Sequence, residues 1–190
     1  WPWVLDRFEA AGVFNQIDAV SSTVDALPAQ ERERILLQAR AYNELLAGES
    51  AELPADQVAP YEEQLIFDRD PMMSWVEIPS INVSMPIYHG TGEEALMAGV
   101  GHLEGTSLPV GGESSHCVLT AHSGMRNLSM FDDIHALEEG DLVLLHTMNQ
   151  TLAYRVTGSE VVWPDEIESL VIDPGTDKLT LVTCTPYGVN

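Results

Sequence analysis

Basic residues are scarce in this sequence. Eight lysine and arginine residues stand against 30 aspartate and glutamate residues, the formal net charge is −22, and Lys178 is the only lysine. A field of this sign repels the phosphates of nucleic acids and the headgroups of anionic lipids. Nucleic-acid binding is therefore excluded. The acidic balance is typical of a well-solvated surface, and it would also attract partners that carry lysines.

Long hydrophobic runs are also missing. No apolar stretch approaches the roughly 18 residues that a membrane-spanning helix needs. The N-terminus lacks the basic flank and apolar centre of a secretory signal peptide. Hydrophobic residues nevertheless make up 45% of the 190 residues, which predicts one globular domain with a single substantial core.

The two cysteines are too few for a disulfide scaffold. Cys117 lies in an apolar strand pattern beside His116, and we interpret it as a core residue. No loop follows the EF-hand pattern, and no histidine and cysteine pairs have zinc-site spacing. The sequence therefore predicts no metal site and no cofactor.

The N-terminal part reads as helical, over residues 4–48. The polar run 21–25 is expected to interrupt it, and Leu27-Pro28 to begin a long helix that ends at Gly48. One apolar face is expected on that helix. Its members are Ile35, Leu36, Ala39, Tyr42, Leu45 and Leu46.

A loose acidic connection over residues 49–61 separates the helices from a β-rich part. Short alternating patterns punctuated by glycine and proline predict strands there. The predicted strands are 74–78, 82–88, 115–122, 141–147, 151–157, 159–163 and 178–184. With helical turns at Glu93–Gly99 and Met130–Leu137, this pattern favours a mainly β fold closed into a barrel.

Two of these strands deliver reactive residues to their ends. One runs from Lys178 to Cys184 and is followed at once by a Thr-Pro-Tyr-Gly turn; the other runs from His116 to His122 and is followed by Ser-Gly. A thiol at a strand-to-turn junction is held rigidly on one side and open on the other, as a nucleophile requires. Cys184 is the candidate nucleophile and His122 its partner, which would protonate a leaving amine.

The residues around the cysteine, Thr180-Leu-Val-Thr-Cys-Thr-Pro-Tyr-Gly-Val-Asn190, closely resemble the cysteine motif of sortases, the surface-anchoring transpeptidases of Gram-positive bacteria. The continuation Pro-Tyr-Gly-Val-Asn is most similar to class C, the pilus-assembling group. Four further stretches resemble the same group in order and spacing. They are Trp75-Val-Glu-Ile-Pro79, Met85-Pro-Ile-Tyr-His-Gly-Thr91, Gly99-Val-Gly-His-Leu-Glu-Gly-Thr-Ser-Leu-Pro109 and Val118-Leu-Thr-Ala-His-Ser-Gly124.

The resemblance implies an eight-stranded sortase barrel at 74–190, a helical region at 1–60 packed on it, and an entry segment or lid at 61–73. It implies that Cys184 attacks the Thr–Gly bond of an LPXTG-like sorting signal and passes the acyl group to a lysine amine of a pilin. Thr183, His89 and His102 would support the site. The full-length enzyme would be anchored in the membrane with this part on its outer face, and the opening on Trp1, without methionine, leads us to expect a trimmed ectodomain.

The sequence departs from the family pattern in two places. The catalytic arginine of the family is expected just beyond Asn190, and none of the seven arginines present matches it by position. In class C enzymes a lid with an Asp-Pro-aromatic sequence covers the cysteine. Here Asp70-Pro71-Met72 has a methionine in place of the aromatic residue, and an ordinary turn into the barrel is the favoured interpretation. If the segment is a lid, Asp70 would pair with the arginine and Met72 would shield the thiol.

The other histidines are expected to be structural or surface residues. His116 shares a face with His122 but lies six residues away, roughly 20 Å along a strand, which is too far to share one site. His89 and His102 fall in motif-like loops and are read first as hydrogen-bonding groups. His135 and His146 carry no catalytic signal.

Two rival readings stay open. One is a housekeeping-type sortase that anchors proteins to peptidoglycan, and the other is a catalytically silent barrel that binds surface proteins. Calcium bound by scattered acidic loops is also left open. A Cys117–Cys184 disulfide is not expected, because it would remove the nucleophile. A papain-type protease is disfavoured, since no motif of that kind surrounds Cys184.

Overall fold

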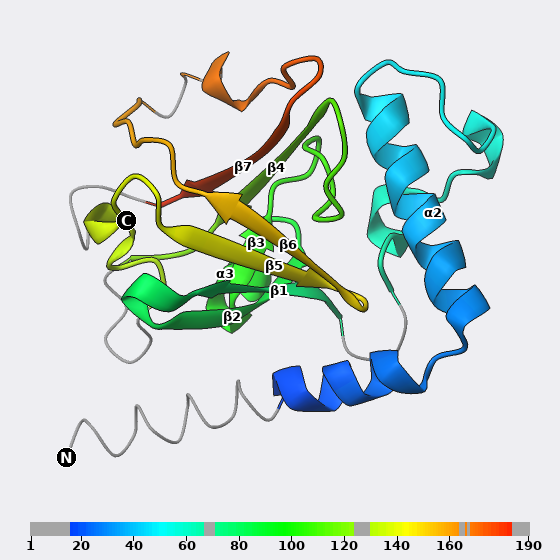
Figure 1. Cartoon of the computed structure of the whole chain (residues 1–190), viewed down its shortest axis with the longest axis horizontal. Coiled ribbons are helices and arrows are strands. Elements are labelled where there is room, and N and C mark those ends of the chain that lie inside the picture. The colour runs from blue at the N-terminus through cyan, green and yellow to red at the C-terminus, as the bar shows by residue number, and fades with distance from the viewer. Residues whose placement is uncertain (1–15, 67–70, 124–129, 164–165, 167, 184–190) are drawn as a thin grey trace.

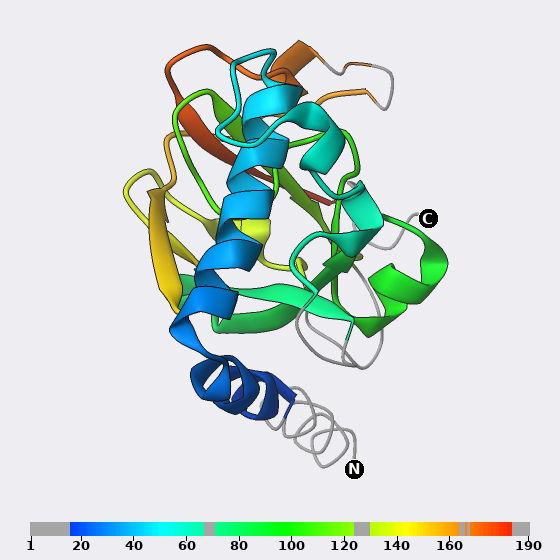
Figure 2. The ribbon, with the colours of Figure 1, turned by 90° about the vertical axis from the view of Figure 1, so that its right-hand side faces the viewer.

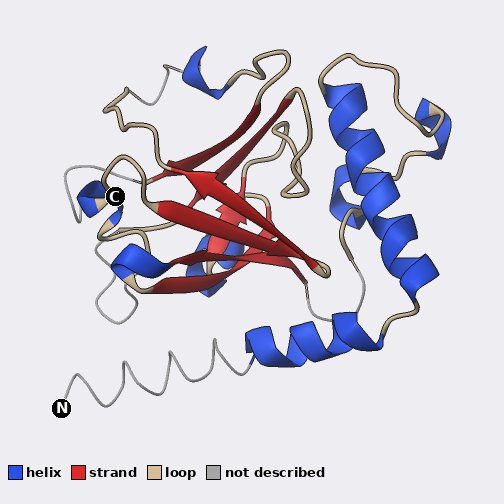
Figure 3. Cartoon of the chain, viewed as in Figure 1, coloured by secondary structure: helices blue, strands red, loops and turns tan. Residues whose placement is uncertain are grey.

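The computed structural model describes residues 16–66, 71–123, 130–163, 166 and 168–183. Helices from the N-terminal part lie along one side and below a strongly curved sheet (Figures 1 and 3). The predictions for residues 1–15, 67–70 and 184–190 fall outside the described residues.

The sheet has seven strands among the described residues, in the order β6-β5-β1-β2-β3-β4-β7, and it curls into a nearly closed barrel (Figure 1). The pairs β2–β3 and β4–β7 are parallel, and the other neighbours are antiparallel. The strands are β1 (Met72–Ile78), β2 (Val83–His89), β3 (Val100–His102), β4 (Ser115–Thr120), β5 (Leu142–Thr147), β6 (Gln150–Arg155) and β7 (Asp177–Val182). The mainly β class and the sortase-like barrel are confirmed, while the expected eighth strand is not among the described residues.

The predicted strand at 159–163 is wrong. This segment makes no strand pairing, and Val161 is 83% exposed. The sequence signal was a run of apolar residues, which a strand and an exposed loop can share. Conversely, β3 was missed because glycine is depleted in strands. There the glycines permit a close approach: a Cβ on Gly101 would lie 2.5 Å from the backbone oxygen of Gly90.

The N-terminal helices meet at a corner. Residues 16–26 form one helix and α2 (Ala29–Leu46) the next, so the predicted break at 21–25 is wrong and the chain turns at Leu27-Pro28 instead. Proline lacks the N–H that would continue the first helix. Arg32 fixes the corner, because its Nη1 donates to the carbonyls of Val24 and Leu27 at 3.1 and 2.6 Å. A cation there suits the negative end of the first helix.

The remaining helical elements are short. The turn predicted at Glu93–Gly99 is confirmed as α3 (Glu93–Ala98), whereas only η4 (Ile134–Ala136) forms within 130–137. The other single turns are η1 (Ala55–Gln57), η2 (Tyr61–Glu63), η3 (Pro79–Ile81) and η5 (Glu168–Leu170). No helix in the described part of the chain is both long and apolar enough to cross a membrane.

Helix α2 runs beside the barrel and buries one face against it (Figure 2). Ile35, Leu36 and Ala39 are buried as the periodicity predicts, but Leu46 is exposed. The sequence did not single out Asn43, which is buried. Its amide nitrogen donates to the carbonyl of Leu108 at 3.1 Å, and its oxygen accepts from the Leu108 N–H at 2.7 Å. A polar side chain therefore ties the helix to the barrel.

A carboxylate closes the barrel on the other side. Asp177, at the start of β7, accepts hydrogen bonds from the Tyr154 hydroxyl of β6 at 2.7 Å and from the Gly112 N–H at 3.0 Å. β6 and β7 are the first and last strands of the sheet order. Burial raises the pKa of the Tyr154 phenol well above its usual value, and the bond to Asp177 adds to the rise. The phenol therefore stays protonated and keeps its donor.

We expect Asn43→Ala to lower the free energy of unfolding by about 2–4 kcal/mol, because it leaves both backbone groups of Leu108 buried without partners. Guanidinium unfolding followed by circular dichroism measures the change. Gln38→Ala is the matched control. Gln38 makes the same two-bond link from α2, to the Gln57 carbonyl and the Ala59 N–H, at a position reached by water. Equal losses for the two variants would contradict the importance of burial.

Candidate active site

The ends of β4 and β7 lie level with each other. The two strands run parallel, in register from Ser115 opposite Asp177 to Thr120 opposite Val182. The contact continues one residue further, since the Ala121 N–H donates to the Val182 carbonyl at 3.2 Å. Two chain segments that are far apart in the sequence therefore end side by side.

Thr183 reinforces this junction. Its hydroxyl donates to the Ala121 carbonyl at 2.9 Å. Ala121 and Thr183 are the residues directly before His122 and Cys184. Cys184 itself lies outside the described residues, but the described chain on both strands up to that point is fixed by these hydrogen bonds.

His122 is half-buried at the end of β4. Its carbonyl accepts a hydrogen bond from the Phe131 N–H at 3.2 Å, and Phe131 is fully buried. The neighbours Ala121 and Ser123 are buried as well. The backbone at His122 is therefore anchored while the residue stays partly accessible, which suits a residue that exchanges protons with a bound molecule.

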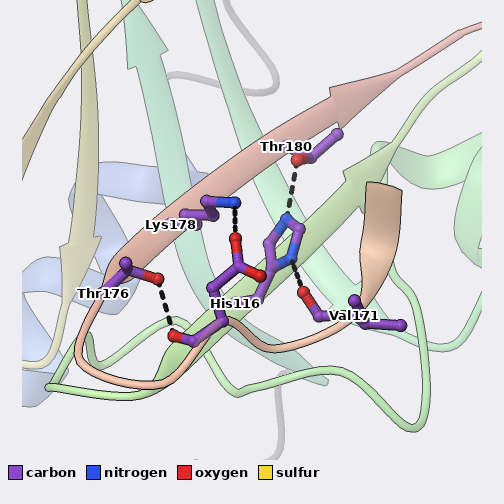
Figure 4. Close-up of polar contacts among 6 residues, drawn as sticks. His116, Val171, Thr176, Lys178 and Thr180 are labelled. Atoms are coloured by element: carbon purple, nitrogen blue, oxygen red, sulfur yellow. Dashed lines mark hydrogen bonds and ion pairs between the residues drawn. The ribbon is translucent and has the colours of Figure 1, made fainter. Parts of the chain in front are cut away.

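His116 has its ring fully engaged elsewhere. Its Nδ1 donates to the Val171 carbonyl at 2.9 Å, and its Nε2 accepts from the Thr180 hydroxyl at 2.7 Å (Figure 4). A carbonyl only accepts, so the proton is on Nδ1. The imidazole is buried and links β4, β7 and the loop between η5 and β7. The ring therefore serves the fold, whereas the sequence predicted only that His116 lies too far from His122 to share one site.

The same loop is held by an ion pair. The ammonium of Lys178 contacts the Asp173 carboxylate, and the Thr176 hydroxyl donates to the Asp173 carbonyl at 2.8 Å (Figure 4). The Lys178 ammonium lowers the pKa of the Asp173 carboxyl, which is exposed. Exposed pairs contribute little to stability, so the pair orders the loop more than it stabilises the fold.

His89 and His102 gather around Tyr61, a residue that the sequence analysis did not single out. The Tyr61 hydroxyl lies 2.9 Å from His102 Nδ1 and accepts from the Gly90 N–H at 2.9 Å, while His102 Nε2 donates to the Ser107 carbonyl at 2.9 Å. His89 packs edge-on against the Tyr61 ring. A lone tyrosine in an acidic connection carries no sequence signal for such a role.

Burial sets the protonation of this histidine pair. Loss of solvation lowers the pKa of His102 to about 4 and also lowers that of His89, whose Nε2 donates to the Gln64 carbonyl at 2.9 Å. Both rings are therefore neutral hydrogen-bonding groups near pH 7. They hold residues 61–64 on the barrel, at the ends of β2 and β3.

The two remaining histidines make their hydrogen bonds with other parts of the chain. His135 Nδ1 lies 2.9 Å from the Asp132 carbonyl. His146, on β5, stacks on Trp75 with ring centroids 4.8 Å apart and an interplanar angle of 10°, and its Nε2 lies 3.3 Å from a Glu77 oxygen.

Cys117 is a free, buried thiol on β4. Burial raises the pKa of this thiol far above its usual value. It is therefore protonated and unreactive, as expected of a core cysteine. No group of three or more histidine, cysteine, aspartate or glutamate residues in the described ranges could hold a metal ion.

The possible lid is only partly described. Asp70 lies outside the described residues, and Pro71 is exposed. Met72 is the first residue of β1, pairs with Tyr88 of β2 and is 1% exposed. The barrel therefore begins two residues earlier than the predicted strand at 74, and Met72 packs in its core.

The sortase domain model matches residues 76–190. The chain belongs to the sortase family. Sortases are cysteine transpeptidases.

Solved class C sortases share both the barrel and the N-terminal helices. Sortase C1 from Streptococcus agalactiae is 36% identical with a TM-score of 0.84, and the match covers 93% of this chain and 92% of that one. Sortase C from Clostridium perfringens, solved with the C-terminal cell wall sorting motif, is 41% identical with a TM-score of 0.81 over 93% and 92%. Sortase C-1 from Actinomyces oris is 44% identical with a TM-score of 0.74 over 85% and 92%.

Curated relatives match over a shorter part. Sortase A from Bacillus anthracis is 30% identical over 117 residues, which are 62% of this chain and 54% of that protein. Sortase D from Bacillus subtilis is 30% identical over 59% and 54%. The chain spans about half the length of these two relatives. The solved class C sortases, in contrast, match both the barrel and the N-terminal helices at 36–44% identity, which supports a class C sortase.

The buried His102 ring predicts a loss of stability in acid. The unfolded chain takes up a proton below about pH 6.5, whereas the folded chain does so only near pH 4. Protonation of His102 therefore leaves the free energy of unfolding unchanged above pH 6.5. As the pH drops below 6.5 it lowers this free energy, by about 3 kcal/mol at pH 4. Guanidinium unfolding of the wild type and His102→Gln at pH 7, 5.5 and 4.5 isolates it. Parallel pH profiles for the two proteins would refute this assignment.

Proposed function

We propose that this sortase is a class C transpeptidase that joins pilin subunits. It cleaves an LPXTG-like sorting signal between threonine and glycine and transfers the threonyl acyl group to a lysine amine of the next pilin. The observation that carries the proposal is the level ending of β4 and β7, which puts the backbone before His122 beside the backbone before Cys184.

The chemistry follows from that placement. The Cys184 thiolate attacks the threonine carbonyl, so that a C–S bond forms while the C–N bond to glycine breaks. His122 gives the glycine amine its proton. The neutral lysine amine then attacks the thioester and gives a proton back to His122, while its C–N bond forms, the C–S bond breaks and the thiolate returns. A thiol suits this sequence because the thioester persists until an amine arrives.

Two further groups complete the proposal. An arginine expected beyond Asn190 would stabilise the oxyanion, an effect worth about 10²–10³ in rate. Asp70, with Pro71 beside it, would act as a lid residue if residues 67–70 cover the thiol. A lid of this kind must open for substrate and lowers activity until it does. One structural neighbour is a lid mutant of Streptococcus agalactiae sortase C1, which supports a lid as an element of class C sortases.

The cellular setting is part of the same proposal. The enzyme would work at the outer face of the cell membrane, where its substrates are surface proteins with C-terminal sorting signals. The acid-rich surface, with a net charge of −22, favours approach of a lysine-bearing acceptor. One structural neighbour is described as sortase C1 of GBS Pilus Island 1, which supports a pilin substrate.

A housekeeping role is the second candidate. The curated relative from Bacillus anthracis is a sortase A, which supports a sortase outside class C as the alternative. The helices at 16–46 favour class C, because the class C structures match over 85–93% of this chain. The acceptor decides between them: a lysine side chain in a pilin, or a peptidoglycan amine.

We expect Cys184→Ala to abolish cleavage of a fluorogenic LPXTG-type peptide and His122→Ala to reduce it by about 10²–10⁴-fold. The assay uses the chain together with the residues expected after Asn190. His135→Ala is the matched histidine control and should cleave like the wild type. An inactive wild type with native circular dichroism, also after removal of residues 67–70, would favour the silent-barrel reading and reject the proposal.

Thr183 gives an independent test of the strand junction. Thr183→Val removes the bond to the Ala121 carbonyl, and we expect a stability loss of about 0.5–1.5 kcal/mol with about tenfold lower kcat for peptide cleavage. Thr183→Ser retains the hydroxyl and should recover most of the rate. If valine and serine variants cleave equally, the bond does not position the nucleophile.

A further inference from the structure

The segment that follows β6 exposes three consecutive apolar side chains. Val161 is 83% exposed, Val162 46% and Trp163 74%. Five other large apolar residues are exposed in the described part of the chain, and no two of them are adjacent in sequence. They are Leu46, Ile66, Met97, Leu142 and Val171. We call Val161, Val162 and Trp163 the β6–β7 apolar patch.

The patch is held in shape by its own loop. The Trp163 N–H donates to a Glu166 side-chain oxygen at 2.8 Å, and the Glu166 N–H donates back to the Trp163 carbonyl at 3.0 Å. These bonds occupy the polar backbone groups of Trp163 without burying its ring. Exposed apolar clusters of this kind mark interaction sites, and tryptophan is enriched among the residues that dominate binding.

Charge around the patch selects the partner. Glu160, Glu166 and Glu168 are exposed carboxylates. The stretch from 156 to 177 contains neither lysine nor arginine. An anionic partner is repelled there, and a purely apolar one would gain nothing from the acidic rim. A lysine side chain satisfies both features, because its methylene stem packs on an aromatic face while its ammonium group meets the carboxylates.

The position of the patch suits an approach to the active site. The segment joins β6 to β7, and Figures 1 and 2 both show it toward the end of the barrel at which β7 finishes. Thr183 follows β7 directly at that end. A chain segment bound at the patch would therefore arrive on the side where the strands end.

We propose that the β6–β7 apolar patch and its glutamate rim dock the lysine-bearing segment of the acceptor protein. This inference rests on the proposed function and deepens it, because it gives the second substrate a binding surface of its own. Trp163 is the anchor, and Glu160 and Glu166 provide the charge that distinguishes lysine from a neutral side chain.

Direct binding tests the docking surface without any chemistry. The probe is a nonapeptide with blocked ends, one central lysine and otherwise neutral residues, titrated by NMR into the Cys184→Ala protein. We expect Trp163→Ala to weaken its Kd about tenfold and Trp163→Phe to weaken it less than threefold. An Nε-acetyl-lysine version should bind the Cys184→Ala protein about tenfold more weakly, because it lacks the charge. Met97→Ala removes an exposed apolar side chain from α3 and should leave the Kd unchanged.

The outcomes separate this inference from the proposed function. Equal Kd values with and without Trp163, or equal binding of the acetylated peptide, would overturn it. If Trp163→Ala weakens the binding of an LPXTG-type peptide as much as that of the lysine peptide, the patch belongs to the sorting signal, and this outcome would also overturn the inference. Cleavage of the LPXTG-type peptide by the wild type tests the proposed function separately. If the wild type does not cleave the LPXTG-type peptide but still binds the lysine peptide through Trp163, the docking surface is supported and the proposed transpeptidation is rejected.

Discussion

The parallel pairing of β4 with β7 is the constraint on which the candidate site depends. Parallel neighbours cannot be joined by a hairpin, so the chain must leave β4, build β5 and β6 on the far edge of the sheet, and return to form β7. The register from Ser115 to Thr120 then decides which residues finish level. A slip of one residue would reverse the faces of one strand against the other and separate the two predicted reactive residues.

Hydrogen-bonded polar side chains along the two strands hold that register. Asp177, the first residue of β7, is bonded to β6 and to the loop before β4. His116 of β4 is bonded to Thr180 in the middle of β7. At the end, Thr183 reaches the Ala121 carbonyl. These three contacts are spaced along the same strand pair. The His116 ring is buried, and a buried polar group is costly to leave without its hydrogen bond, so this contact penalises a shifted register.

The helical region adds a second layer of organisation. Asn43 ties α2 to Leu108, and Tyr61 ties the following segment to the ends of β2 and β3. The class C neighbours match over this helical region as well as over the barrel. The N-terminal part is therefore packed on the barrel through specific side chains, and not only through an apolar face.

Strand patterns, the apolar face of α2 and the motif around Cys184 were readable from the sequence, because alternation and local turn residues act over a few positions. They indicated a sortase barrel and the pair Cys184 and His122 as the candidate site. The run Val161–Trp163 misled the strand prediction, since an apolar run does not report whether a partner strand exists. Gly101 had the opposite effect and caused β3 to be missed, because the sequence does not reveal that the backbone of Gly90 lies too close for a side chain at this position.

Tertiary structure alone decided which distant residues meet. Asn43 with Leu108, Tyr61 with His102 and Tyr154 with Asp177 are separated by 65, 41 and 23 positions, and nothing in the local sequence of either partner indicates the other. The exposed patch at Trp163 has the same origin, because only the folded barrel shows that no described element covers it. Local composition determines what each segment can form, and hydrogen bonds between polar groups that meet only in the folded chain determine how the segments are joined.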